Sequence, residues 1–192
     1  AMRRFTDQRQ PDTSSEIWLL QHPPVFTLGQ AGKPEHILDP GGIPVVRSDR
    51  GGQVTYHGPG QLIVYLLINL QQAQTGVRGL VSVMEDSVIE LLGKHGVTAF
   101  SRSDAPGVYA GDAKIAALGL RVRRGLTYHG LALNMDMNLA PYDRINPCGY
   151  AGQKITQTRS LGLKLDMQQA ATELVSLLAA KLHYFPIWTS ND

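Results

Sequence analysis

A single cysteine and one lysine are the side chains in this 192-residue chain whose positions best suit covalent chemistry. Cys148 lies between Pro147 and Gly149, so it belongs to a loop, and a loop can present a thiol to a substrate. A deprotonated thiol is a strong nucleophile. A free cysteine is nevertheless often only a small, buried hydrophobic residue, and its position alone favours this ordinary interpretation.

Lys114 begins a stretch predicted to be a strand, residues 114–122, where it would point the same way as Ala116 and Leu118. An ammonium group at the start of an apolar face is partly desolvated, which lowers its pKa. Such a lysine can accept a proton from a thiol or, as a cation, stabilise the thiolate. Lysines at strand ends also commonly extend to water, so Lys114 alone does not identify a site.

The third feature is the segment Arg50–Gln61, RGGQVTYHGPGQ, which precedes an apolar stretch. Its glycines allow the backbone to approach a ligand, and their N–H groups can bind a carbonyl or an oxyanion. A tight connection with unusual dihedral angles would need the same residues. The segment lacks the phosphate-binding patterns GxxxxGK[ST] and GxGxxG. His57 within it is a candidate general base or positioning donor.

Composition places the chain among ordinary globular proteins. It is 43% hydrophobic and 18% charged, which suits one core, and we expect a single domain over residues 1–192. The net charge of +2 does not indicate a nucleic-acid partner, and one cysteine with scattered histidines shows no metal-ligand spacing. No apolar run reaches about 18 residues and no signal peptide is evident, so we expect no membrane span and a cytoplasmic location.

The elements that must position these side chains are mostly strands. Strands are expected at residues 16–21, 25–28, 61–70, 97–100, 114–122 and 128–139, with another at Val45 and Val46. Helical spacing of apolar residues predicts helices over residues 80–94 and after a capping Asp166, and residues 1–9 suggest a short helix. Helices occur singly between groups of strands, which predicts an α+β fold rather than strict βαβ alternation.

Four blocks cover most of residues 16–162. They are HPPVFTLG at 22–29, RGGQVTYHGPGQ at 50–61, KIAALG at 114–119 with HGLALN at 129–134, and PCG at 147–149. In type and order they resemble the LipB family, the lipoyl(octanoyl) transferases of lipoate biosynthesis. The second block is highly specific. Cys148 and Lys114, each ordinary when taken singly, thereby become a candidate catalytic pair.

The resemblance implies the fold of biotin and lipoate protein ligases, with a mixed main sheet, a smaller sheet and flanking helices. It implies that Cys148 receives the acyl chain as a thioester and that Lys114 activates it, without a cofactor or a metal. The residues implied to line the acyl and pantetheine site are Arg50, Gly51, Gly52, Gln53, Val54, Thr55, Tyr56, His57, Ala117, Leu118, Gly119, Gly130, Leu131 and Ala132. Members of the family carry a strand before the segment matching residues 2–9, so an N-terminal strand is expected to be truncated here.

The implied reaction moves an octanoyl group from octanoyl-acyl carrier protein to a lysine of a lipoyl domain, the first step of endogenous protein lipoylation. The implied acceptors are E2 subunits of 2-oxoacid dehydrogenases and the glycine cleavage H protein. Arg121, Arg123 and Arg124 could steer an acidic carrier protein, or simply form a solvated hairpin tip. The alternatives are an ATP-dependent lipoate-protein ligase and a non-catalytic module that binds acyl groups or carrier proteins. No exposed apolar heptad is evident, so a monomer is expected.

Overall fold

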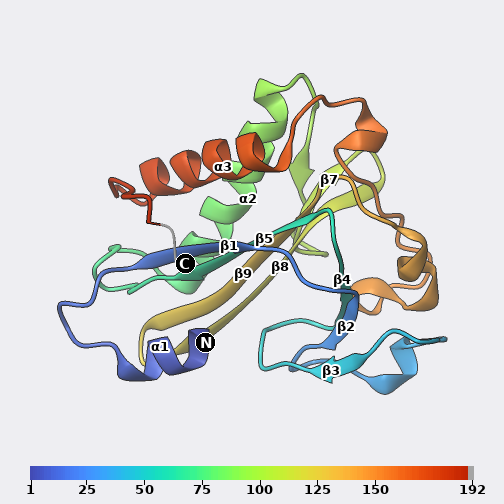
Figure 1. Ribbon diagram of the computed structural model, residues 1–192, viewed down its shortest axis with the longest axis horizontal. Coiled ribbons are helices and arrows are strands. Elements are labelled where there is room, and N and C mark those ends of the chain that lie inside the picture. The colour runs from blue at the N-terminus through green and yellow to red at the C-terminus, as the bar shows by residue number, and fades with distance from the viewer. Residues whose placement is uncertain (190–192) are drawn as a thin grey trace.

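The computed structural model describes residues 1–189 and contains a larger and a smaller β-sheet (Figure 1). The larger sheet has the strand order β1-β5-β9-β8-β7-β6. Its strands are β1 (Glu16–Leu20), β5 (Gln61–Leu67), β6 (Phe100–Ser101), β7 (Val108–Ala110), β8 (Ala113–Arg123) and β9 (Leu126–Asn134). Every neighbouring pair among them is antiparallel. The hairpin of β8 and β9 forms the centre of the sheet and carries Lys114 at one end.

The smaller sheet has the order β3-β2-β4 and lies beside one end of the larger sheet (Figure 1). Its strands are β2 (Val25–Leu28), β3 (Val45–Arg47) and β4 (Val54–His57). Strand β2 pairs parallel with β3 and antiparallel with β4. The predicted α+β class, with a larger and a smaller sheet, is confirmed. Parallel pairing of named strands occurs in the smaller sheet, whereas the larger one is antiparallel.

Three helices flank the larger sheet. They are α1 (Met2–Gln8), α2 (Val77–Lys94) and α3 (Met167–Lys181), with α2 and α3 together on one face (Figure 1). Asp166 caps α3 as predicted, since its Oδ1 accepts the Gln169 backbone N–H at 2.7 Å. Within residues 1–189, no helix is long and apolar enough to cross a membrane.

Two hydrophobic cores hold the sheets in place. The larger core joins β5 and β9 to the buried faces of α2 and α3, where Leu80, Met84 and Leu174 are fully buried. The smaller core joins β2 and β4 to Tyr142 and Ile145, which belong to the irregular segment between β9 and α3. This second core therefore attaches the segment that carries Cys148 to the smaller sheet.

Several element boundaries differ from the sequence-based expectations. Strand β5 ends at Leu67 rather than 70, and α2 begins at Val77 rather than 80. Strand β9 ends at Asn134 rather than 139, because the Met135 and Asp136 N–H groups donate to the Gly60 carbonyl instead of continuing the ladder. Strand β4, inside the glycine-rich segment, and strand β7 were not predicted.

The strand expected at residues 97–100 is reduced to the two residues of β6. The Val97 N–H donates to the Leu92 carbonyl, so this residue completes the turn that ends α2 rather than pairing with a strand.

Gly130 provides a test of the central sheet. A Cβ atom there would lie 2.1 Å from the Val64 carbonyl oxygen, which is backbone and cannot move aside. Gly130→Ala should therefore lower the free energy of unfolding by about 2–3 kcal/mol. Gly93→Ala is the matched control: nothing lies within 4 Å of its added Cβ on α2, so it should raise stability by up to about 1 kcal/mol. Urea unfolding measures both, and equal effects would contradict the packing argument.

Candidate active site

Lys114 and Cys148 meet in the folded chain although 34 residues separate them. The Lys114 ammonium donates a hydrogen bond to the Cys148 sulfur, with Nζ 3.2 Å from Sγ. The backbone brings them together: Lys114 N–H donates to the Lys154 carbonyl at 2.8 Å, and Thr156 N–H donates to the Lys114 carbonyl at 2.9 Å. The chain that follows the Cys148 loop thus pairs with the start of β8 and closes the loop over Lys114.

The Lys114 side chain is almost completely buried, with 3% of its surface exposed. Besides Cys148, its Nζ donates to the Pro106 carbonyl at 3.1 Å and lies 5.2 Å from the ring centroid of Tyr109, a cation–π distance. Burial alone lowers the pKa of Lys114, but the charge of the neighbouring Cys148 sulfur and the Tyr109 side chain outweigh it, and the pKa is raised. The lowered pKa predicted from the sequence was therefore wrong, because that argument counted desolvation without these partners. The raised pKa favours a cation that stabilises a thiolate.

Cys148 lies in a short 3-10 turn, Pro147–Gly149, and is half-buried. Its φ angle is +57°, a left-handed conformation that costs a non-glycine residue on the order of 1 kcal/mol. The Gly149 N–H donates to the Asn146 carbonyl at 2.9 Å, and the Tyr150 hydroxyl donates to the Asp104 carbonyl at 2.9 Å. These contacts hold the strained turn and aim the sulfur at Lys114.

Arg50 supplies a second buried cation. Its guanidinium donates to the Thr27 and Gln53 carbonyls, both at 2.7 Å, and to the Gly51 carbonyl at 2.8 Å. No carboxylate within residues 1–189 forms a salt bridge with it. Burial lowers the pKa of Arg50 to about 10, and the charge of Cys148 partly opposes that shift. A buried cation paired only with neutral oxygens can attract an anionic group at Cys148.

The glycine-rich segment packs directly on β8. Gly51 N–H donates to the Leu120 carbonyl at 2.9 Å, and a Cβ at Gly119 would lie 3.0 Å from the Gly51 carbonyl oxygen. Gln53 extends toward the Cys148 loop, where a Cβ at Gly149 would lie 3.5 Å from its Cγ. These glycines therefore permit close approach of two backbones, and bring residues 50–53 beside the candidate nucleophile.

A cavity of about 10 Å³ lies beside Cys148, and its lining shows which of the predicted site residues lie near the thiol. Of the implied substrate residues, Thr55 and Ala117 line it. The side chains of Val54, Tyr56 and Leu131 instead belong to the two hydrophobic cores. Gly130 also permits the tight pairing of β9 with β5, and its predicted place in the substrate site stays a prediction.

A buried polar network stands behind this cavity. Gln61 Nε2 donates to Asn134 Oδ1 at 2.8 Å and to the Tyr142 hydroxyl at 3.1 Å, and the Tyr142 hydroxyl donates to the Tyr56 carbonyl at 3.1 Å. His57 Nδ1 lies 2.8 Å from Gln61 Oε1. Burial, the largest influence, lowers the pKa of His57 to about 4, so this imidazole is neutral at pH 7.

Comparison with known proteins identifies the family. Residues 1–179 match the family described as the lipoyl protein ligase A/B catalytic domain. A protein of Pseudomonas putida strain W619, named octanoyltransferase, is 59% identical over 184 residues, which are 96% of this chain and 86% of that protein. This chain belongs to the octanoyltransferase family. The family predicted from the four sequence blocks is therefore confirmed.

Solved structures support the predicted fold of this chain. A lipoate-protein ligase A bound with ATP superposes with a TM-score of 0.79 at 16% identity, covering 99% of this chain and 82% of that one. A biotin protein ligase from Aquifex aeolicus gives a TM-score of 0.53 at 16% identity, covering 65% of this chain and 53% of that one. The shared architecture of lipoate and biotin protein ligases is the one expected from the sequence.

Sequence reasoning missed several residues at this candidate site. Asn134, Tyr142 and Ile155 line the cavity beside Cys148, and Tyr109 and Pro106 contact Lys114. Asn134 carried a signal, because it is a polar residue ending an apolar strand and closing the HGLALN block. The other residues belong to no recognisable motif, and only the fold brings them near the site.

Within residues 1–189, no group of three His, Cys, Asp or Glu side chains is arranged to hold a metal ion.

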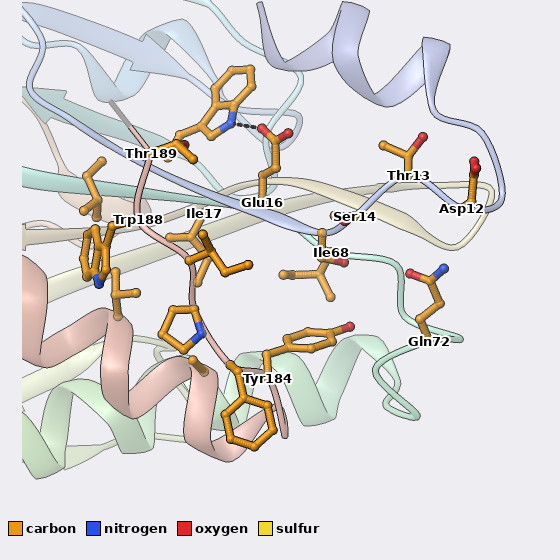
Figure 2. Close-up of a pocket in the computed structure, with 18 residues that line it drawn as sticks. Asp12, Thr13, Ser14, Glu16, Ile17, Ile68, Gln72, Tyr184, Trp188 and Thr189 are labelled. Atoms are coloured by element: carbon orange, nitrogen blue, oxygen red, sulfur yellow. Dashed lines mark hydrogen bonds between the residues drawn. The ribbon is translucent and has the colours of Figure 1, made fainter. Parts of the chain in front are cut away.

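A second cavity, about 990 Å³, lies away from this chemistry (Figure 2). It is bounded by β1 and by the segment after α3, and its lining includes Ile17, Tyr184 and Trp188. None of the predicted catalytic or substrate residues lines it. Size alone therefore does not identify the site, and the small cavity at Cys148 is the one next to a nucleophile.

The depressed pKa of His57 predicts a pH dependence of stability. Between its folded pKa of about 4 and its ordinary value of 6.5, the unfolded chain binds a proton that the folded chain does not, so stability falls as pH falls through this window. His57 alone should contribute a loss of about 2 kcal/mol in the free energy of unfolding between pH 7 and pH 5. Urea unfolding at both pH values should show a smaller loss in His57→Gln. An equal loss would mean that His57 is protonated in the folded state.

Proposed function

We propose that this protein transfers an octanoyl group from an acyl-carrier-protein thioester to a lysine of a lipoyl domain in the cytoplasm, through a thioester on Cys148. The observation that carries the proposal is the 3.2 Å hydrogen bond from the Lys114 ammonium to the Cys148 sulfur in a water-poor site. The relatives named octanoyltransferase supply the identity of the acyl group.

In the first step the Cys148 thiolate attacks the thioester carbonyl of the donor. The new carbon–sulfur bond forms through a tetrahedral intermediate, and the bond to the carrier thiol breaks. Lys114 gives its proton to the departing carrier thiolate, so the step ends with acylated Cys148, a neutral Lys114 amine and a free carrier thiol. Arg50, buried and without a carboxylate partner among the described ion pairs, adds positive charge that favours the thiolate before attack.

The second step uses the neutral Lys114 as a base. Acylation removes the sulfur charge, which contributes to the raised pKa of Lys114, so that pKa falls and burial favours the neutral amine. The amine of the acceptor lysine attacks the Cys148 thioester, Lys114 takes its proton, and the Cys148 thiolate leaves as the amide forms. The ion pair is restored, and no nucleotide is consumed.

The proposed partners are an acyl carrier protein as donor and lipoyl domains of E2 subunits or the H protein as acceptors. Arg121, Arg123 and Arg124 stand at the far end of β8, with Arg123 on the order of 30 Å along the strand from Lys114. Arg123 also forms a salt bridge with Asp7. This cluster therefore fits long-range steering of an acidic carrier rather than contact around the thiol.

Intact mass spectrometry tests the covalent intermediate. Incubation with octanoyl-acyl carrier protein alone should add one octanoyl group to the protein, and Cys148→Ser should not acquire a thioester under the same conditions. The adduct should disappear when an apo-lipoyl domain is added, as that domain gains the octanoyl group. Binding without a mass change would support the non-catalytic module. Transfer only from free octanoate with ATP would support the ligase.

Lys114→Met tests the proton-transfer role. The methionine side chain nearly fills the same volume without a charge, so the variant should keep the fold and lose at least about 100-fold in the rate of Cys148 acylation. Single-turnover mass spectrometry measures the rate, and thermal unfolding checks the fold. A thioester that forms at the wild-type rate would show that Lys114 does not activate Cys148.

A further inference from the structure

Residues 104–107, between β6 and β7, form a backbone clamp around Lys114. Each residue of this segment uses one backbone polar group to bind a different side chain of the site. The four contacts are Asp104 C=O with the Tyr150 hydroxyl at 2.9 Å, Ala105 C=O with the Tyr109 hydroxyl at 2.8 Å, Pro106 C=O with Lys114 Nζ at 3.1 Å, and Gly107 N–H with Glu85 Oε1 at 3.0 Å. We call residues 104–107 the clamp segment.

The clamp segment packs directly on the lysine. Gly107 has a φ angle of +139°, and a Cβ there would lie 3.0 Å from Lys114 Cε and 2.8 Å from the Ala116 carbonyl oxygen. The position of the Pro106 carbonyl therefore determines where the ammonium can sit. A small displacement of the clamp segment would move Nζ relative to the Cys148 sulfur.

Of these four contacts of the clamp segment, the contact with Glu85 is made by a helix residue. It lies on α2 between side chains anchored in the larger core, since Met84 and Val88 are fully buried. Its carboxylate accepts the Gly107 N–H from this rigid position. Burial raises the pKa of Glu85, with a smaller contribution from Asp86, while the Gly107 N–H and the Lys114 charge oppose the rise. Glu85 and Lys114 thus interact electrostatically as well as through the backbone.

We propose that Glu85 is a positioning residue for the Lys114–Cys148 pair. By holding Gly107, it fixes the Pro106 carbonyl on the ammonium and keeps Nζ within hydrogen-bond distance of Sγ. The inference rests on the proposed function, because it assigns Glu85 a role in that same reaction. Glu85 itself does not touch the thiol and acts through the clamp segment.

Two substitutions separate hydrogen bonding from charge. Glu85→Gln keeps a carbonyl oxygen that can accept the Gly107 N–H, whereas Glu85→Ala removes the acceptor. The matched control is Asp86→Asn, a neighbour on the same helix that is exposed to solvent. Cys148 is the sole cysteine, so iodoacetamide alkylation reports its reactivity without interference. We would measure three quantities for each variant and for Lys114→Met. They are the rate of acylation by octanoyl-acyl carrier protein, the rate of alkylation from pH 6 to 9, and the thermal unfolding midpoint.

The expected pattern differs between the variants. Glu85→Ala should slow acylation about tenfold because the ammonium is misplaced, and its pH of half-maximal alkylation should lie above that of Glu85→Gln, which loses the same charge but keeps the hydrogen-bond acceptor. Glu85→Gln should stay within about threefold of wild type, and its alkylation midpoint should remain or move to lower pH because a nearby negative charge is lost. Asp86→Asn should keep the acylation rate within about twofold of wild type, because the Asp86 carboxylate is exposed and water screens its charge.

The remaining outcomes overturn the inference. A Glu85→Ala protein that loses thermal stability but keeps the alkylation midpoint and the acylation rate per folded molecule would show a purely structural role. A Glu85→Gln protein as slow as Glu85→Ala would show that charge, rather than positioning, matters. If Lys114→Met changes the midpoint but Glu85→Ala matches Glu85→Gln in both midpoint and acylation rate, only the Glu85 inference fails. If neither changes it, the proposed Lys114–Cys148 pair fails as well.

Discussion

The burial of the Lys114 ammonium is the constraint on which the rest of the site depends. Taking an isolated cation out of water costs several kcal/mol, and the cost is met only if the group finds good partners. Lys114 finds the Cys148 sulfur, the Pro106 carbonyl and the face of the Tyr109 ring. The sulfur comes from the segment after β9, and the other two partners come from β7 and the stretch that leads into it, so the charge is tolerated only when both stretches are in place around β8.

The two-sheet architecture supplies those loops. The β8–β9 hairpin is held between β5 and β7, which makes Lys114 the start of a rigid central strand. The smaller sheet brings Arg50 and Thr55 toward the same place, and its hydrophobic core holds Tyr142 of the segment that leads to Cys148. The proposed nucleophile, Cys148, therefore lies on an irregular segment, but both ends of that segment are fixed to regular structure.

The sequence contained the reacting groups but not their surroundings. Cys148 and Lys114 could be predicted because their blocks are local and specific, and the capped helix α3 because its signals lie within a few residues. The direction of the Lys114 pKa shift could not be predicted from the sequence, because it depends on partners that only the fold brings near. Pro106 contacts Lys114 through a backbone carbonyl, which every residue type carries, and Glu85 is one of several acidic residues on α2, so no motif marks either of them. Strand β4 was hidden because it is only four residues long and is flanked by glycines and a proline.

The cavity beside Cys148, about 10 Å³, is close to the smallest space that admits one water molecule. An eight-carbon chain needs far more room, so if it lies beside Cys148, as proposed, the side chains or segments around this cavity have to move apart. The free energy needed to open that space would then come from binding of the acyl chain. Under the proposed function, the length of the acyl chain would set how far the surroundings of Cys148 must open. Selection by length would then be a mechanical property of the resting protein rather than a matter of a matching preformed tunnel.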